Sequence, residues 1–192
     1  MPQLQQLELN QYPGGRFTDE GVAVLRQLPA LRVFSMTWQR GITDAGVRHL
    51  EACHALEHVD VMGTETGDAL IAAMAGKTRL KVLHTGRLVS DGGLARLRDV
   101  PQLVARPATG EDGAHLLIDG PFTNAGFAHV GALAGIVKLD LFWHVKTITS
   151  AAFAHLTRLP HLATLGADDH LSDDDAMAHF AAIPGLRDLR AQ

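Results

Sequence analysis

Apolar residues recur in the same pattern seven times along this chain. Each copy begins at a short polar residue, here called the anchor. Apolar residues follow the anchor by three, six and twelve positions, as in Val22, Leu25 and Leu31. The anchors are separated by steps of 25, 24, 23, 33, 26 and 24 residues and are Asp19, Asp44, Asp68, Asp91, Asn124, Ser150 and Asp174. Seven copies in register indicate a repeat protein rather than a chance alignment.

The spacing of the apolar residues changes halfway along each copy. In the first half, apolar residues three apart, such as Val47 and Leu50, lie on one face of a helix. The anchor is Asp, Asn or Ser, whose side chains accept hydrogen bonds from free N–H groups, so we expect it at the helix start. The second half alternates, as in "LEHVDV" (residues 56–61), and predicts a half-buried strand. Each copy therefore predicts a short strand, a turn and a helix.

The repeats fill residues 1–192 as a single domain. One strand, "LQQLEL", precedes the first anchor and another, "LRDLRA", follows the last, which predicts eight strands and seven helices. The strands should be parallel, because each crossover carries a helix. The 33-residue step predicts an irregular insertion near residues 104–115, where Arg106 takes a core position and Pro107 cannot donate to a ladder. We expect a loop or hairpin there, and the regular strand at Leu116–Asp119.

The stretch "ITDAGVRHLEACHALEHVDV" (residues 42–61) resembles the leucine-rich repeat family, and the resemblance covers essentially the whole chain. It is similar to the cysteine-containing and bacterial "TDAGL"-type repeats, with Cys53 in the cysteine position. The resemblance implies an α/β fold, a right-handed solenoid or horseshoe with a parallel sheet on its concave face and helices on its convex face. It also implies protein binding, as in F-box-type adaptors and bacterial effectors.

Composition narrows the possible partners. A net charge of −4 and the absence of any Lys/Arg run argue against nucleic acid, which requires a concentrated basic face. The apolar runs are too short for a membrane span, and the N-terminus lacks the features of a signal peptide. A single cysteine excludes an internal disulfide framework and favours a cytoplasmic protein. No motif indicates a cofactor.

Four of the eleven histidines share one position, five residues after their anchors: His49, His129, His155 and His179. A metal-binding ladder is one interpretation. However, neighbouring helices lie roughly 10 Å apart, whereas zinc ligands converge within about 2.1 Å of the ion. We therefore interpret these histidines as structural and partly exposed. Cys53 occupies a position that is mostly apolar in the other repeats, which favours a small buried hydrophobe over a nucleophile.

His58 and Asp60 stand at strand positions that point away from the helices. His84 takes the position of Asp60 one repeat later, and adjacent strands lie about 4.8 Å apart, so we expect Asp60 and His84 to be direct neighbours. The favoured interpretation is an exposed polar pair. A metal-binding or hydrolytic site at His58, Asp60 and His84 is the alternative, although no nucleophile completes a triad beside them.

The first functional hypothesis is a non-catalytic interaction module that binds a protein or peptide through the concave face and its rim. Trp38 and Trp143 share one position just beyond the strand and suit a binding hot spot, or they could pack under the loops. The predicted binding residues are Ser35, Trp38, His58, Asp60, His84, Lys138, Asp140, Phe142, Trp143, Asp168 and Arg190.

The terminal strands suggest a third hypothesis, a structural segment of a larger assembly. Solenoids normally close with polar capping units, and open strand edges invite pairing with another chain. Here the apolar strand pattern begins at Leu4 and stops at Leu189. We expect end-to-end homo-oligomers, or a partner that covers one end.

Overall fold

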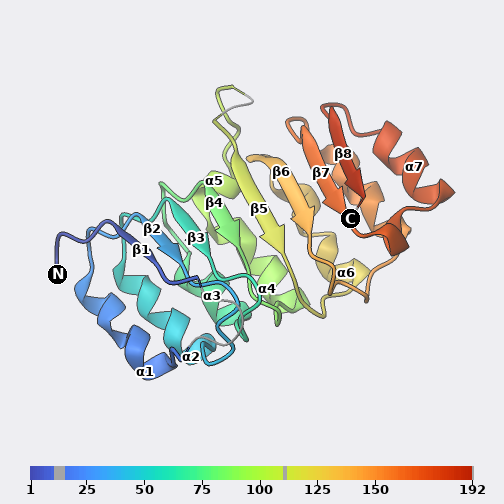
Figure 1. The fold of residues 1–192 in the computed structure, drawn as a ribbon. Coiled ribbons are helices and arrows are strands. Elements are labelled where there is room, and N and C mark those ends of the chain that lie inside the picture. Colours follow the sequence, from blue (N-terminus) through green and yellow to red (C-terminus); the bar gives the residue numbers. More distant parts are fainter. Residues whose placement is uncertain (11–15, 110–111, 192) are drawn as a thin grey trace.

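The computed structural model describes residues 1–10, 16–109 and 112–191, which include one parallel sheet of eight strands. The strands follow one another in sequence order across the sheet, from the blue to the red end of Figure 1. They are β1 (Gln6–Glu8), β2 (Val33–Ser35), β3 (His58–Asp60), β4 (Val82–His84), β5 (Ala114–Ile118), β6 (Ile136–Leu141), β7 (Thr164–Ala167) and β8 (Asp188–Ala191). The predicted α/β solenoid-like arrangement is confirmed at this level.

A helical segment connects each pair of consecutive strands, and these segments cover one face of the sheet (Figure 1). Most are one or two turns long and change from α-helix to 3-10 helix (η). In order they are α1 (Asp19–Val22) with η1 (Ala23–Gln27), α2 (Asp44–Val47) with η2 (Arg48–Ala52), α3 (Asp68–Ala73), α4 (Asp91–Arg96) with η3 (Leu97–Asp99) and α5 (Pro101–Val104), α6 (Asn124–Phe127) with η4 (Val130–Ala132), η5 (Ser150–Arg158), and η6 (Asp169–Leu171) with α7 (Asp174–Ala181). The other face of the sheet is called the open face below.

The core lies between the sheet and the helical segments. The residue six positions after each anchor is buried in all seven repeats, from Leu25 to Phe180. The residue three positions after the anchor is buried in six repeats, but Met177 in the last is 55% exposed. The expectation of a core residue there is wrong for Met177, because no described helix follows α7 to cover it.

The anchors begin the helices but do not cap them. Helix α2 starts at Asp44, and the residue before it, Thr43, is the N-cap, whose hydroxyl accepts from the amide of Ala45. The carboxylate of Asp44 instead accepts from the backbone amides of Gly67 and Ala69 in the next repeat. The expected role of the anchor is therefore corrected: it connects its own repeat to the following one.

The insertion ends earlier in the sequence than predicted. Helix α5 ends at Val104, Arg106 is exposed, and β5 begins at Ala114, two residues before the predicted strand start. Gly110 and Glu111 lie outside the described residues. The pairing of β5 with β6 shifts register between Ala114 and His115. The described residues that precede β5 leave the array as a protrusion beside it (Figure 1).

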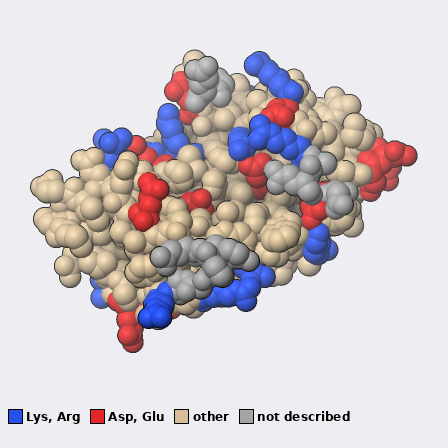
Figure 2. Space-filling view, in the orientation of Figure 1, with Lys and Arg blue, Asp and Glu red and all other residues tan. Residues whose placement is uncertain are grey.

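Within the part of the chain that the structure describes, the sheet is open at both ends, since β1 pairs only with β2 and β8 only with β7. No helix among the described residues is long and apolar enough to cross a membrane. On the face shown in Figure 2, acidic and basic side chains are interspersed, and most of the surface carries neither.

Candidate functional site

Strand register brings histidines and carboxylates together on the open face. Alternate residues of each strand point to this face. In one register row His58 aligns with Val82, His115 and Lys138 along β3 to β6. In the next row Asp60 aligns with His84, Leu117 and Asp140. The two rows place charged groups from four consecutive strands next to one another.

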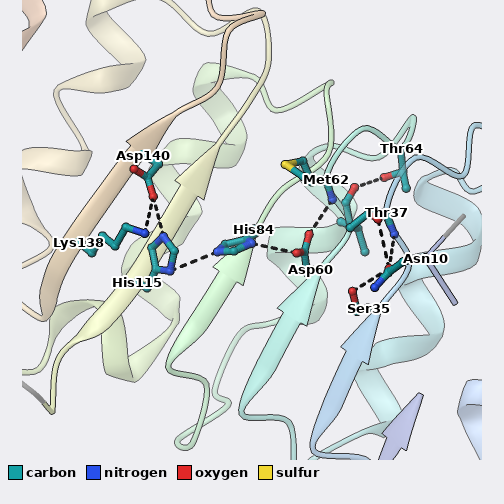
Figure 3. Close-up of polar contacts among 11 residues, drawn as sticks. Asn10, Ser35, Thr37, Asp60, Met62, Thr64, His84, His115, Lys138 and Asp140 are labelled. Carbon is teal, nitrogen blue, oxygen red and sulfur yellow. Dashed lines mark hydrogen bonds and ion pairs between the residues drawn. The ribbon is translucent and has the colours of Figure 1, made fainter. Parts of the chain in front are cut away.

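Four of these side chains form a continuous line of contacts, called the polar row: Asp60, His84, His115 and Asp140 (Figure 3). His84 Nδ1 lies 3.0 Å from Asp60 Oδ2, and His84 Nε2 lies 3.3 Å from His115 Nδ1. His115 Nε2 then lies 2.8 Å from Asp140 Oδ2. Lys138 Nζ lies 3.2 Å from the same carboxylate oxygen. The line therefore crosses β3, β4, β5 and β6.

The carboxylates fix the tautomers at both ends of the polar row. An ionised carboxylate only accepts, so His84 Nδ1 donates to Asp60 and His115 Nε2 donates to Asp140. Burial alone would raise the pKa of Asp60, but hydrogen bonds from His84 and the Met62 amide help to lower it below its ordinary value. Burial acts in the same sense on Asp140, and the His115 and Lys138 contacts outweigh it, so its pKa is also lowered.

His58 stands beside this row without being hydrogen-bonded into it. Its ring centroid lies 5.9 Å from that of His84, and its Nε2 is buried with no hydrogen-bond partner. Burial lowers the pKa of His58, and burial also lowers the pKa of His115 despite the hydrogen bond to Asp140. One ligand atom from each of His58, Asp60 and His84 lies within 4.8 Å of the other two.

The predicted contact between Asp60 and His84 is confirmed, and both side chains are only 16% exposed rather than fully solvated. The sequence pattern did not lead us to predict a role for His115. The expected strand began at Leu116, so His115 fell into the insertion. The alternating pattern could have indicated it, because His115 stands two residues before Leu117 and so points to the same face of the strand.

A second group, called the aromatic rim, lies just past the strand ends: Trp38, Phe142, Trp143 and His144. The ring centroids of Trp38 and Phe142 lie 6.0 Å apart, although their repeats are separated by β3, β4 and β5. Phe142 also contacts Trp143 and His144, with ring centroids 5.8 and 5.1 Å away. The rim therefore joins distant repeats.

The two tryptophans have different surroundings. Trp38 is half-buried, has a positive φ of 62°, and packs so tightly over Gly63 that a Cβ there would stand 2.5 Å from its ring. Trp143 is 57% exposed. Trp38 thus packs against the following repeat, and Trp143 is the member of the pair that presents its ring to solvent.

The other predicted binding residues have local partners. Ser35 is buried, and its hydroxyl donates to Asn10 Oδ1 over 2.9 Å. Asp168 contacts Lys146 and His170, and Arg190 pairs with Asp188 on its own strand. These contacts of Ser35 and Asp168 lie outside the polar row and the aromatic rim. The pKa of Arg190 is raised by Asp188 and, more weakly, by Asp140 of the polar row.

The residues interpreted as structural behave as such. Cys53 is fully buried, its thiol donates to the Leu25 carbonyl over 3.3 Å, and burial raises its pKa. His49 is half-buried beside Arg26, whose guanidinium nitrogens lie 3.0 and 3.1 Å from the ring nitrogens. The only group of three or more possible metal ligands among the described residues is His58, Asp60 and His84.

Comparison with protein-family models finds no family that matches this chain, and comparison with curated proteins finds no match either. The repeat pattern and the geometry of the open face therefore carry the functional argument.

Proposed function

We propose that this protein is a non-catalytic interaction module of the leucine-rich repeat class. It binds a protein or peptide through the concave, open face of its sheet and through the aromatic rim. The observation that carries the proposal is the exposed ring of Trp143, held on Phe142 and His144. A large aromatic side chain fixed by neighbours and open on one side is what binding hot spots use.

Hydrolysis is disfavoured by the order of residues across the strands. Ser35 aligns with Asp60, and Asp60 with His84, so the carboxylate stands between the hydroxyl and the imidazole. A nucleophilic triad needs the imidazole in the middle. The Ser35 hydroxyl is also engaged with Asn10, and the thiol of Cys53 is buried in the core. These arrangements support recognition rather than bond cleavage.

We also propose that the protein is cytoplasmic, and its cysteine usage supports this proposal. Its single cysteine is a free, buried thiol. Structural disulfides are common in exported domains and rare in cytosolic ones. An adaptor-like or effector-like recognition role would be compatible with this location.

The test is affinity capture from the native cell with three baits: the unchanged chain, Trp143→Ala and Met177→Ala. Met177 is the matched control, because it is 55% exposed and apolar but lies on α7, far along the chain from the rim. We expect a partner retained by the unchanged chain and by Met177→Ala, and lost with Trp143→Ala. Retention by both variants would contradict binding through the rim, and loss only with Met177→Ala would move the site to the last repeat.

Trp38→Ala is a poorer test. Its ring fills the space above Gly63 and contacts Phe142, so its removal changes packing between repeats as well as the binding surface.

A further inference from the structure

The group of His58, Asp60 and His84 has a use that protein binding does not require. We propose that these three residues bind one divalent transition-metal ion, with Zn²⁺ the best fit. Two imidazoles and one carboxylate are a ligand set typical of zinc, whereas Ca²⁺ and Mg²⁺ prefer oxygen ligands alone. Three protein ligands leave the fourth tetrahedral position for water or for a side chain of a bound partner.

The distances between the ligand atoms are compatible with a tetrahedral zinc ion. Zinc bonds of about 2.0 to 2.1 Å in tetrahedral geometry place two ligand atoms about 3.3 Å apart. Asp60 Oδ2 and His84 Nδ1 lie 3.0 Å apart, and the three ligand atoms lie within 4.8 Å of one another. Metal binding would draw the His58 ligand atom closer to the other two.

His58 has a ring nitrogen that could coordinate the ion. Its Nε2 is buried and has no hydrogen-bond partner. A buried polar atom without a hydrogen-bond partner has lost its hydration without compensation, so such atoms are rare without a reason. A metal ion next to His84 would give this nitrogen an ion to coordinate.

The number of hydrogens along the polar row also favours a bound metal ion. Its three contacts need three N–H groups, because neither carboxylate donates. Two neutral imidazoles carry only two. If a metal ion replaces the hydrogen between Asp60 and His84, two contacts remain. His84 Nε2 then donates to His115, His115 Nε2 donates to Asp140, and both imidazoles are neutral.

This arrangement gives His115 and Asp140 a positioning role. Metal-binding histidines usually donate their second N–H to an acceptor that fixes the ring orientation. His84 would donate to His115, which is itself held by Asp140. Asp60 is fixed in a similar way, because its other oxygen accepts from the Met62 amide over 3.1 Å. The ligands are thus oriented by groups from β5, β6 and the turn after β3.

The experiment is calorimetric titration of the tag-free, metal-free chain with zinc chloride at near-neutral pH. We expect one equivalent to bind. His58→Gln and His84→Gln should abolish saturable binding, whereas His115→Gln should weaken it about 10- to 100-fold as an outer-shell change. His155→Gln is the matched control, because this half-buried helical histidine lies outside the proposed site, and it should bind zinc as the unchanged chain does.

Binding that survives both His58→Gln and His84→Gln, or that is lost with His155→Gln, would overturn the proposal. A second measurement does not depend on how the variants fold. Cobalt(II) added to the unchanged chain should give the intense visible absorption of a tetrahedral ion, and zinc should displace it at one equivalent. No saturable cobalt spectrum would also overturn the proposal.

Discussion

The carboxylate of Asp68 holds Ser90 of the next repeat by two hydrogen bonds, from the backbone amide over 2.9 Å and from the hydroxyl over 2.6 Å. Asp19 binds Thr43 in the same way, and Asp91 binds Thr123. The anchors therefore form a ladder of side chains between successive helix starts. Each rung stabilises the stacking of two repeats rather than one helix.

Asp68→Ala should lower the free energy of unfolding by about 2 kcal/mol, because it removes two hydrogen bonds to a charged group and leaves the Ser90 amide without its acceptor. Urea denaturation followed by circular dichroism measures the change. Asp174→Ala is the control, since Asp174 has the same position in the last repeat and no described helix follows it. Equal losses in the two variants would mean that the carboxylate acts within its own helix.

The glycine two positions after the anchor makes room for the ladder. A Cβ on Gly93 would stand 2.2 Å from Asp68 Oδ1, and one on Gly46 would stand 2.4 Å from Asp19 Oδ1. Gly21 has the same position in the first repeat, where nothing lies within 4 Å of the added atom. The requirement for glycine thus comes from the preceding repeat.

Gly93→Ala should destabilise the protein by about 1 to 3 kcal/mol, the usual cost of forcing an extra carbon into a packed position. Gly21→Ala should instead stabilise it by up to about 1 kcal/mol, because alanine favours helix over glycine. Thermal unfolding of the two variants side by side is the measurement. A destabilised Gly21→Ala would show that the first repeat needs glycine for some other reason.

Asp119 gives the protein a pH-dependent weakness. Its side chain is fully buried, Oδ1 has no hydrogen-bond partner, and Oδ2 accepts from His144 over 2.8 Å. Burial raises the pKa of this carboxyl above its ordinary value of 3.8, against the hydrogen bond from His144. The fold therefore holds this proton more tightly than the unfolded chain does. This proton binding contributes stability that is fully present below pH 3.8 and is lost as the pH rises through the folded-state pKa of Asp119.

The stability of the unchanged chain relative to Asp119→Asn should therefore fall as the pH rises from 3.8 toward neutrality. Chemical denaturation of both proteins at a series of pH values measures this difference. Asp173→Asn provides a control of opposite sign. The backbone amide of Ala176 lowers the pKa of Asp173, so the unchanged chain should gain relative stability as the pH rises. A pH-independent difference for Asp119→Asn would contradict the prediction.

The open edges of the sheet should mediate self-association. The edge strand β8 pairs only with β7, and Leu189 on it is 40% exposed. Exposed apolar edge strands pair readily with other chains, and a lysine at the edge opposes this. Sedimentation velocity over a range of concentrations should show a mass that rises with concentration, and Leu189→Lys should reduce the rise. A single monomeric species at high concentration would refute end-to-end association.

The repeat itself was readable from sequence because each unit carries its own strand and helix pattern. Leu25, Leu50 and their equivalents had to be buried, whatever the details of the fold, and the pairing of Asp60 with His84 followed from strand spacing. The predictions that are wrong concern residues whose burial or hydrogen bonds depend on the neighbouring repeat. Met177 is exposed because none of the described helices covers it, and the anchors bind the next repeat instead of their own helix.

The stacking of strand–turn–helix units can be read from the amino-acid sequence alone, because hydrophobic periodicity is a local property and recurs seven times. Which polar side chains meet depends on the three-dimensional packing of the repeats. His115 joins His84 because the insertion ends two residues earlier than its pattern suggested, and Phe142 reaches Trp38 across three intervening strands. Such contacts depend on strand register and on how loops return to the array, which no single repeat encodes.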